Sequence, residues 1–202
     1  MAKRLVCCYI TPGQLNRDGR RLMKVTIQKH LEYGSGYLEL KMYEEAVREA
    51  EEALALEPDQ PQAIALKSAA LWQANRLKEA EPYLARLAEM NPGNSGLLIN
   101  LAYIRRRTQS LDAAIETLER ALQIDPRDAL ARFNMACYRA VQHRTGEALA
   151  FLKNALDLDP QLKKLARCEP DLAELRELPE YQQLVSGPKT PGKAGDASRR
   201  SE

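Results

Sequence analysis

The chain has 202 residues, of which 45% are hydrophobic, 29% are charged and 5% are aromatic. This length is typical of one domain, or of two at most. No apolar run approaches the roughly 20 residues that a membrane-spanning helix needs. The apolar run at residues 5–10 is also shorter than the roughly 7–15 residues of a signal-peptide core. We therefore expect no membrane span and a cytoplasmic protein.

Charge is distributed unevenly along the chain. Residues 1–26 contain six basic residues and one acidic residue, and residues 186–202 contain four and two, which leaves 20 basic and 25 acidic residues in 27–185. A dedicated nucleic-acid-binding protein concentrates positive charge on a folded face. We do not expect nucleic acid as the main partner, but an accessory role in which the basic N-terminal arm contacts phosphates is the alternative function.

The interior of the chain repeats with a period of 34 residues. Prolines recur at this spacing in one column, alanines in a second and small residues in a third. The columns are Pro58, Pro92, Pro126 and Pro160; Ala46, Ala80, Ala114 and Ala148; and Gly34, Ser68, Ala102 and Ala136. Three columns that share one period identify an internal repeat.

Each repeat has the pattern of two amphipathic helices joined by a turn. In residues 111–124 the apolar residues keep the three- and four-residue spacing of a helix face. Ser110 is a suitable N-cap for this helix, and Pro126 prevents its continuation. Since a pair of helices cannot bury its apolar faces alone, neighbouring repeats must stack. The predicted repeats are 27–60, 61–94, 95–128 and 129–162.

These columns resemble the tetratricopeptide repeat family, whose unit is a 34-residue helix–turn–helix. The resemblance implies an all-α fold, a right-handed α-solenoid of four such repeats with short C-terminal capping helices. Arg105 and Arg139 depart from the pattern, because the same column holds the apolar Tyr37 and Leu71 in the first two repeats. The first repeat is nearly complete, with family residues at Gly34, Tyr37, Tyr43, Ala46, Ala53 and Pro58.

The segments outside the repeats have different patterns. Residues 163–185 contain leucines spaced for short helices, interrupted by Pro170 and Pro179, and we predict that they form a C-terminal cap over the apolar end of the array. We predict a flexible basic arm at 1–26 and, because apolar periodicity is absent there, a disordered tail at 186–202.

The sequence contains no pattern of residues that indicates catalysis. Cys7, Cys8, Cys137 and Cys168 lack metal-ligand spacing, and the two histidines are isolated from each other. The glycines at 34 and 36 follow no strand and have no lysine at the offset of a phosphate-binding loop. We therefore expect no enzyme activity, no catalytic residue, no metal and no cofactor.

Binding is the remaining function. The resemblance places it in a concave groove lined by the first helix of each repeat, where an adaptor, scaffold or assembly factor holds an extended peptide or a partner protein. The predicted groove residues are Leu31, Leu38, Trp72, Ile99, Asn100, Tyr103, Arg106, Phe133 and Asn134.

Two features of this predicted groove indicate how it binds. Asn100 and Asn134 are one repeat apart, and their amides suit a bidentate grip on a peptide backbone, or else hydrogen bonds to a neighbouring helix. Trp72, Tyr103 and Phe133 form a predicted aromatic stripe, with Arg106 beside it, of the kind that anchors interfaces. Burial between repeats is the alternative for the aromatic residues and is the favoured one for Phe133.

The family's best-defined recognition mode clamps the C-terminal carboxylate of a chaperone with Lys, Asn and Arg, and we do not expect it here. In the first repeat, the columns that need Lys and Asn hold Leu31 and Ser35. In the third repeat, the cationic columns hold Gly96 and Asn100. A chaperone tail is therefore not the expected partner.

Overall fold

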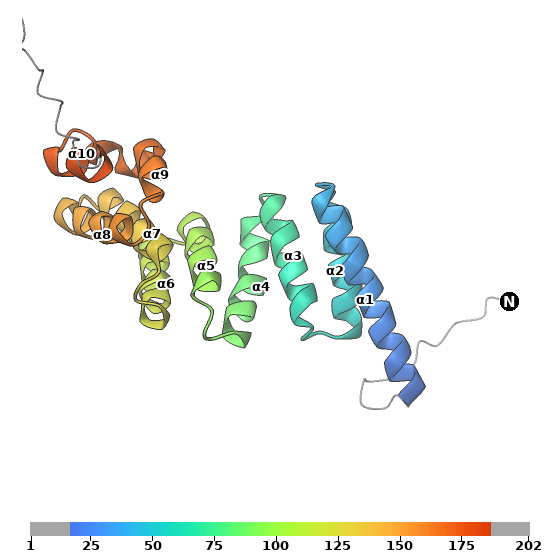
Figure 1. Cartoon of the computed structure of the whole chain (residues 1–202). Coiled ribbons are helices and arrows are strands. Elements are labelled where there is room, and N and C mark those ends of the chain that lie inside the picture. Colours follow the sequence, from blue (N-terminus) through green and yellow to red (C-terminus); the bar gives the residue numbers. More distant parts are fainter. Residues whose placement is uncertain (1–16, 187–202) are drawn as a thin grey trace, which may run out of the picture. The chain divides into compact units, whose positions relative to one another are not determined.

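The computed structural model describes residues 17–186, without the side chain of Arg17. Every regular element in this range is a helix (Figure 1), which confirms the predicted all-α fold of paired helices. The elements are α1 Arg17–Glu39, α2 Tyr43–Leu56, α3 Pro61–Gln73, α4 Leu77–Met90, α5 Ser95–Thr108, α6 Leu111–Ile124, α7 Ala129–Val141, α8 Thr145–Leu158, α9 Leu162–Cys168, the 3₁₀ helix η2 Pro170–Leu175 and α10 Pro179–Ser186.

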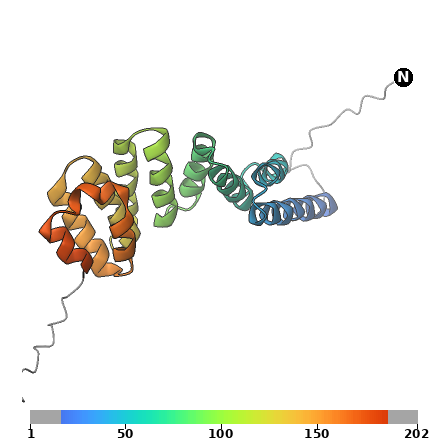
Figure 2. The same ribbon diagram turned by 90° about the horizontal axis from the view of Figure 1, so that it is seen from above.

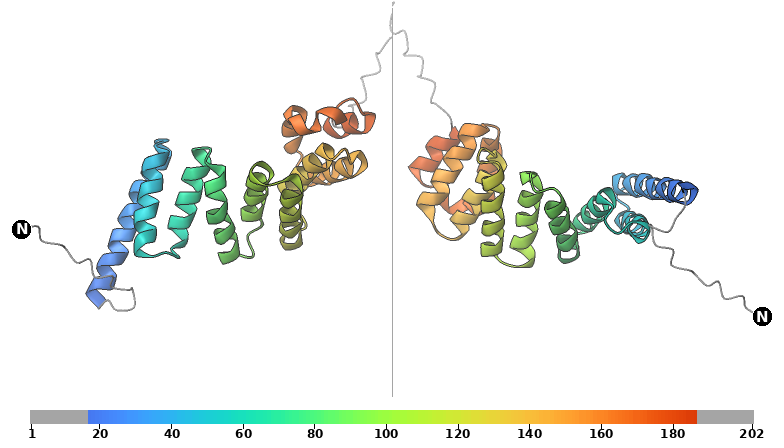
Figure 3. Two further views of the ribbon diagram at one scale, coloured as in Figure 1. Left: turned by 180° about the vertical axis from the view of Figure 1, so that it is seen from behind. Right: turned by 90° about the horizontal axis from the view of Figure 1, so that it is seen from below.

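The chain divides into two compact units, Met1–Ala114 and Ile115–Glu202, with the boundary inside α6. In the first unit α1 to α5 pack in chain order, each helix against the next (Figure 3), and α1 also contacts α3. In the second unit the principal helix pair is α7 and α8. Sequential packing of neighbours is the architecture that stacked repeats require.

Polar side chains define where the first helices of the later repeats begin. Helices α3, α5 and α7 begin at the first residues of the predicted repeats 2, 3 and 4. The residue before each of them accepts a hydrogen bond from a backbone N–H of the first turn, which satisfies a donor that the helix leaves open. These N-cap residues are Gln60, Asn94 and Asp128, one repeat apart. The hydroxyl of Ser110 accepts the N–H of Ala113 at 3.1 Å, which confirms the predicted cap of α6.

The columns of small residues lie where helices approach one another closely. Ala46, Ala80, Ala114 and Ala148 have no exposed surface. A Cβ on Gly34 would collide with Cδ2 of Leu66 and would lie 3.2 Å from Cβ of Glu49. Helices α2 and α3 therefore lie so close to position 34 that an added methyl group would require Leu66 and Glu49 to shift.

Two arginines occupy a column that is apolar in the first two repeats, and both are paired with glutamates. Arg139, with a side chain only 13% exposed, lies 3.2 Å from Glu119 and 3.4 Å from Glu147. Arg105 lies 3.5 Å from Glu81. In this column the aliphatic stem of an arginine thus replaces an apolar side chain. Glutamates on the second helices of the repeats compensate the charge of the arginine.

The predicted N-terminal arm at 1–26 requires a correction. Helix α1 begins at Arg17, so the last part of this arm is helical; the rest of it lies outside the described residues. Met23 packs against the buried cluster that includes Ile27, one helical turn later. Because this contact stabilises the helix before the predicted repeat begins, the helix extends beyond the boundary that the repeat pattern sets.

The C-terminal elements pack onto the last helix pair of the second unit. Figure 2 shows α9, η2 and α10 folded back there: η2 contacts α7, and both α9 and α10 contact α8. The hydroxyl of Tyr181 donates to the carbonyl of Ala166 at 2.7 Å. These elements occupy the range predicted as a cap. Of the tail predicted at 186–202, only Ser186, the end of α10, is described.

Candidate functional site

An open hollow lies between α1 and α3 in the first unit. Its volume is about 460 Å³, and its lining comes from one side of α1 and from the first turns of α3. The lining contains two carboxylates, Glu32 and Glu39, and one of them accepts the side-chain amide of Gln28 at 3.0 Å. The lining residues are Gln28, Leu31, Glu32, Ser35, Gly36, Glu39, Gln62 and Leu66.

An aromatic pair joins α3 to α5 in the same unit. The rings of Trp72 and Tyr103 stack with their centroids 5.3 Å apart and an interplanar angle of 5°. Tyr103 remains 38% exposed, and Trp72 is half-buried. Arg107 donates to the Tyr103 hydroxyl at 2.7 Å, with its guanidinium 5.7 Å from the ring centroid. The pair is therefore a supported aromatic platform rather than a buried core contact.

The predicted groove residues of the first unit lie on the first helices of the repeats and differ in how exposed they are. Leu31 lines the hollow, and Leu38 is half-buried near the end of α1. Asn100 is exposed on α5, one turn before Tyr103, and Arg106 is half-buried. The neighbouring Arg107 contacts Tyr103. The repeat pattern missed Arg107 because it aligns columns and does not resolve the side-chain direction of adjacent residues.

Two predicted groove residues are wrong as contact residues. Ile99 is 5% exposed and Phe133 is 1% exposed, so neither presents a surface to a partner. Both belong to the column that begins with Leu31. Large side chains in this column turn toward neighbouring helices and become part of the core, as the alternative for Phe133 anticipated. The proposed stripe of three aromatic residues is thus reduced to the pair in the first unit.

The second unit contributes one predicted groove residue that is accessible. Asn134 is half-buried on α7. Asn100 belongs to the first unit, so the predicted pairing of the two amides stays a prediction.

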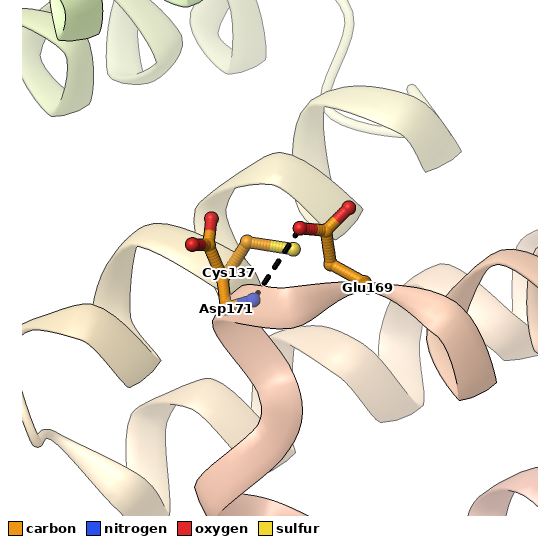
Figure 4. A group of neighbouring side chains, drawn as sticks. All are labelled: Cys137, Glu169 and Asp171. Carbon is orange, nitrogen blue, oxygen red and sulfur yellow. Dashed lines mark hydrogen bonds between the residues drawn. The ribbon is translucent and has the colours of Figure 1, made fainter.

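A cysteine and two acidic residues gather where η2 meets α7 in the second unit. Figure 4 shows Sγ of Cys137 beside the carboxylates of Glu169 and Asp171, with all three ligand-type atoms within 4.8 Å of one another. Glu169 is the N-cap of η2, because its Oε1 accepts the backbone N–H of Asp171 at 3.4 Å. We assign this group a structural role at the start of η2, since the helix cap accounts for the position of Glu169.

Charged residues also connect α2, α3 and α4 on a different face of the first unit. Lys67 lies 2.8 Å from Glu51 and 4.5 Å from the ring centroid of Tyr83. Arg76 pairs with Glu44 at 2.8 Å and with Glu79 at 2.7 Å. The hydrogen bond from Arg76 lowers the pKa of Glu79. The pairs Lys67–Glu51 and Arg76–Glu44 link the first repeat to the second, which is a structural role.

The comparison with known sequences identifies the repeat. Two sequence models described as tetratricopeptide repeat match residues 34–95 and 71–135, which together span half of the chain. The chain is also 31% identical over 88 residues to anaphase-promoting complex subunit 3 of Schizosaccharomyces pombe. That alignment covers 44% of this chain and 13% of the length of the yeast protein.

Solved structures with the same fold support this assignment. A crystal structure of MamA superposes with a TM-score of 0.63 at 19% identity, covering 77% of this chain and 99% of MamA. YrrB, described as a tetratricopeptide repeat protein with an unusual peptide-binding site, gives a TM-score of 0.60 at 17% identity, covering 77% of this chain and 80% of YrrB. The fold therefore defines a repeat protein of stacked helix pairs. The chain belongs to the tetratricopeptide repeat family. No helix between residues 17 and 186 is long and apolar enough to cross a bilayer.

Proposed function

We propose that this chain is a non-enzymatic interaction module that binds an extended segment of a partner protein, acting as an adaptor or assembly factor. The binding surface in this proposal is the α1–α3–α5 surface, defined by the hollow lining together with Trp72, Asn100, Tyr103 and Arg107. The observation that carries the proposal is the aromatic platform, because a stacked pair with an exposed tyrosine is the type of anchor on which interface energy concentrates.

The polar residues of this surface suit the backbone of an extended peptide. The exposed amide of Asn100 offers both a donor and an acceptor, as do Gln28 and Gln62 beside the hollow. An extended peptide has unpaired N–H and C=O groups that need such partners. YrrB, which has the same fold, is described as having a peptide-binding site, and this supports the choice of a peptide as the ligand.

The test is a comparison of matched variants in native-cell capture, followed by binding measurements with each purified partner. The double variant Tyr103→Ala/Asn100→Ala changes two exposed residues of the surface and keeps Trp72 as a fluorescent reporter. The control Tyr33→Ala/Glu52→Ala changes an aromatic residue and a polar residue, also exposed, that lie outside the surface. Circular dichroism establishes that all the variants are folded.

We expect the surface variant to lose specific partners that the wild type and the control variant retain. The loss of a platform ring and of the amide hydrogen bonds, at about 0.5–1.5 kcal/mol for each bond, weakens binding by roughly one to two orders of magnitude. Asn134→Ala tests separately whether α7 contributes. Unchanged binding by the surface variant would contradict the proposal. Binding that falls steeply with salt and depends on Arg20, Arg21 and Lys24 would favour the nucleic-acid alternative.

A further inference from the structure

We propose that the hollow between α1 and α3 receives a cationic side chain, lysine or arginine, of the partner segment. This inference rests on the proposed function and names the chemistry that its surface selects. In this proposal a basic residue of the partner segment binds in the hollow, and the aromatic platform on α3 and α5 binds another part of the same segment.

The charge of the hollow carries the inference. Glu32 and Glu39 line it, and none of its lining residues is basic. Neither carboxylate forms an ion pair among residues 17–186; Glu32 accepts only the neutral amide of Gln28. Some other carboxylates of the first two repeats, such as Glu51 and Glu79, have a cationic partner at 2.8 Å or less. The negative charge of the hollow is therefore available to a bound cation.

The shape of the hollow suits a long aliphatic stem that ends in a charge. Leu31 and Leu66 form an apolar wall, against which the methylene groups of lysine or arginine can pack while the charged group reaches a carboxylate. Glu32 and Glu39 are seven residues apart, so they lie on the same side of α1, about 10 Å apart along its axis. A Cβ built on Gly36 meets nothing within 4 Å, which leaves the space between the two carboxylates open.

The same charge argues against anionic partners at this position. A phosphate or a carboxylate that entered the hollow would meet two uncompensated negative charges at short range. At the other end of the surface, the exposed Arg107 on α5 has Tyr103 as its hydrogen-bond partner and no carboxylate within ion-pair distance among the described residues. The surface is therefore acidic at α1 and basic at α5, and this polarity favours one direction of a bound segment.

The experiment uses three synthetic peptides that differ only in charge. The parent is acetyl-Ser-Leu-Lys-Leu-Lys-Leu-Ser-amide, and both lysines are replaced by glutamine in the second peptide and by glutamate in the third. Affinities are measured on the full chain by calorimetry and by the emission of Trp72, the single tryptophan. The test variant is Glu32→Gln/Glu39→Gln. The matched control is Glu52→Gln/Glu89→Gln, which neutralises two exposed carboxylates outside the hollow.

We expect the lysine peptide to bind the wild type up to about fivefold more tightly than the glutamine peptide, the effect of one exposed ion pair in the hollow. The glutamate peptide should bind more weakly than both. The test variant should lose this preference and bind the lysine and glutamine peptides equally, and the control should behave as the wild type. Gly36→Leu should block all three peptides while the protein remains folded, because its side chain projects into the open space of the hollow.

The outcomes separate this inference from the proposed function. If the three peptides bind equally, or if the test and control variants lose the preference to the same extent, the cationic assignment is overturned and the surface still binds peptides. If none of the peptides binds at millimolar concentration, the cationic assignment is overturned as well, and the partner capture described above decides the proposed function independently.

Discussion

Lys67 on α3 is held between an acidic and an aromatic residue of the flanking helices. Its ammonium contacts Glu51 on α2 and the ring of Tyr83 on α4, and its side chain is 12% exposed. Burial alone would lower the pKa of Lys67, but the hydrogen bonds and charges of Glu51 and Tyr83 outweigh burial and raise the pKa. The charged form is thus stabilised by the folded state, and this one residue connects three helices.

Replacing this ammonium should destabilise the protein in a pH-dependent way. We expect Lys67→Met, which keeps the aliphatic stem, to lower the free energy of unfolding by about 1–2 kcal/mol at pH 7. Because the folded pKa is raised, this stabilisation is fully present below the unfolded pKa of about 10.4 and is lost as the pH rises through the folded pKa. Urea denaturation from pH 7 to pH 11.5 measures the difference between the two proteins. A difference that stays constant over this range would contradict the expectation, and Lys78→Met, at an exposed lysine of α4, is the control.

Individual contact residues were harder to predict than the repeat to which they belong. The column of Leu31, Ile99 and Phe133 is one position in the repeat, yet its first member lines the hollow and the other two are core residues. Spacing places a residue on a helix face, but the volumes of the neighbouring side chains decide how far that face is covered. Trp72 and Tyr103 were predicted on the binding surface, whereas their stacking depends on the distance between α3 and α5, which no sequence pattern specifies.

Helix α1 contains two glycines that differ in their surroundings. Position 34 lies against Leu66 and Glu49, whereas position 36 faces open space. An added methyl group gains about 0.5–1 kcal/mol of helix propensity at either position. At position 34 it also forces the side chain of Leu66 to move and Cβ of Glu49 to shift slightly, and such overpacking costs about 1–3 kcal/mol.

We therefore expect opposite signs for the two alanine substitutions. Gly36→Ala should raise the free energy of unfolding by about 0.5–1 kcal/mol, and Gly34→Ala should lower it by about 1 kcal/mol. Urea denaturation of the two variants under the same conditions makes each the control of the other. An equal stabilisation by both substitutions would show that α1 and α3 separate at no cost, contrary to the close packing described above.

The starts of the first helices in repeats 2 to 4 followed from the repeat period. Helices α3, α5 and α7 begin at the first residue of each predicted repeat, and the structure adds the polar N-caps that precede them. The start of α1 was missed because half of residues 17–22 are arginines and the segment lacks the apolar spacing of a repeat. The two carboxylates of the hollow were missed for a different reason. Glu32 and Glu39 are adjacent in sequence to Leu31 and Leu38, which the repeat pattern selected. Only the structure shows that no basic residue lines the hollow beside them.

We expect α9, η2 and α10 to close one end of the repeat array. Stacked repeats leave an apolar face at each end, and this face must be covered. In the second unit Leu172 of η2, Leu175 of η2 and Tyr181 of α10 are at most 3% exposed, and they cover α7 and α8. Their burial is worth roughly 1.5–3 kcal/mol for each side chain, a large part of a typical stability of about 5–15 kcal/mol.

Truncation after Pro160 should therefore produce a chain that aggregates or dimerises. Buried leucines of α8, Leu152 and Leu156, would lose part of their cover, and a second copy is the nearest apolar surface. Light scattering with size-exclusion chromatography measures the association, and urea denaturation measures the stability. Removal of residues 187–202 alone is the control. A truncated chain that is monomeric and as stable as the control would show that α9, η2 and α10 do not act as a cap.

The rate at which a reagent modifies the buried thiol of Cys137 would measure how often the C-terminal elements open. Cys137 is 3% exposed, whereas Cys168 on α9 is exposed. In a Cys7→Ser/Cys8→Ser background, a thiol reagent should modify Cys168 at once and Cys137 only during the intervals when η2 lifts from α7. When closing is faster than modification, the ratio of the observed rate to that of a free thiol is the equilibrium constant of this local opening. Cys137 would then report how often η2 lifts from α7 in the native protein.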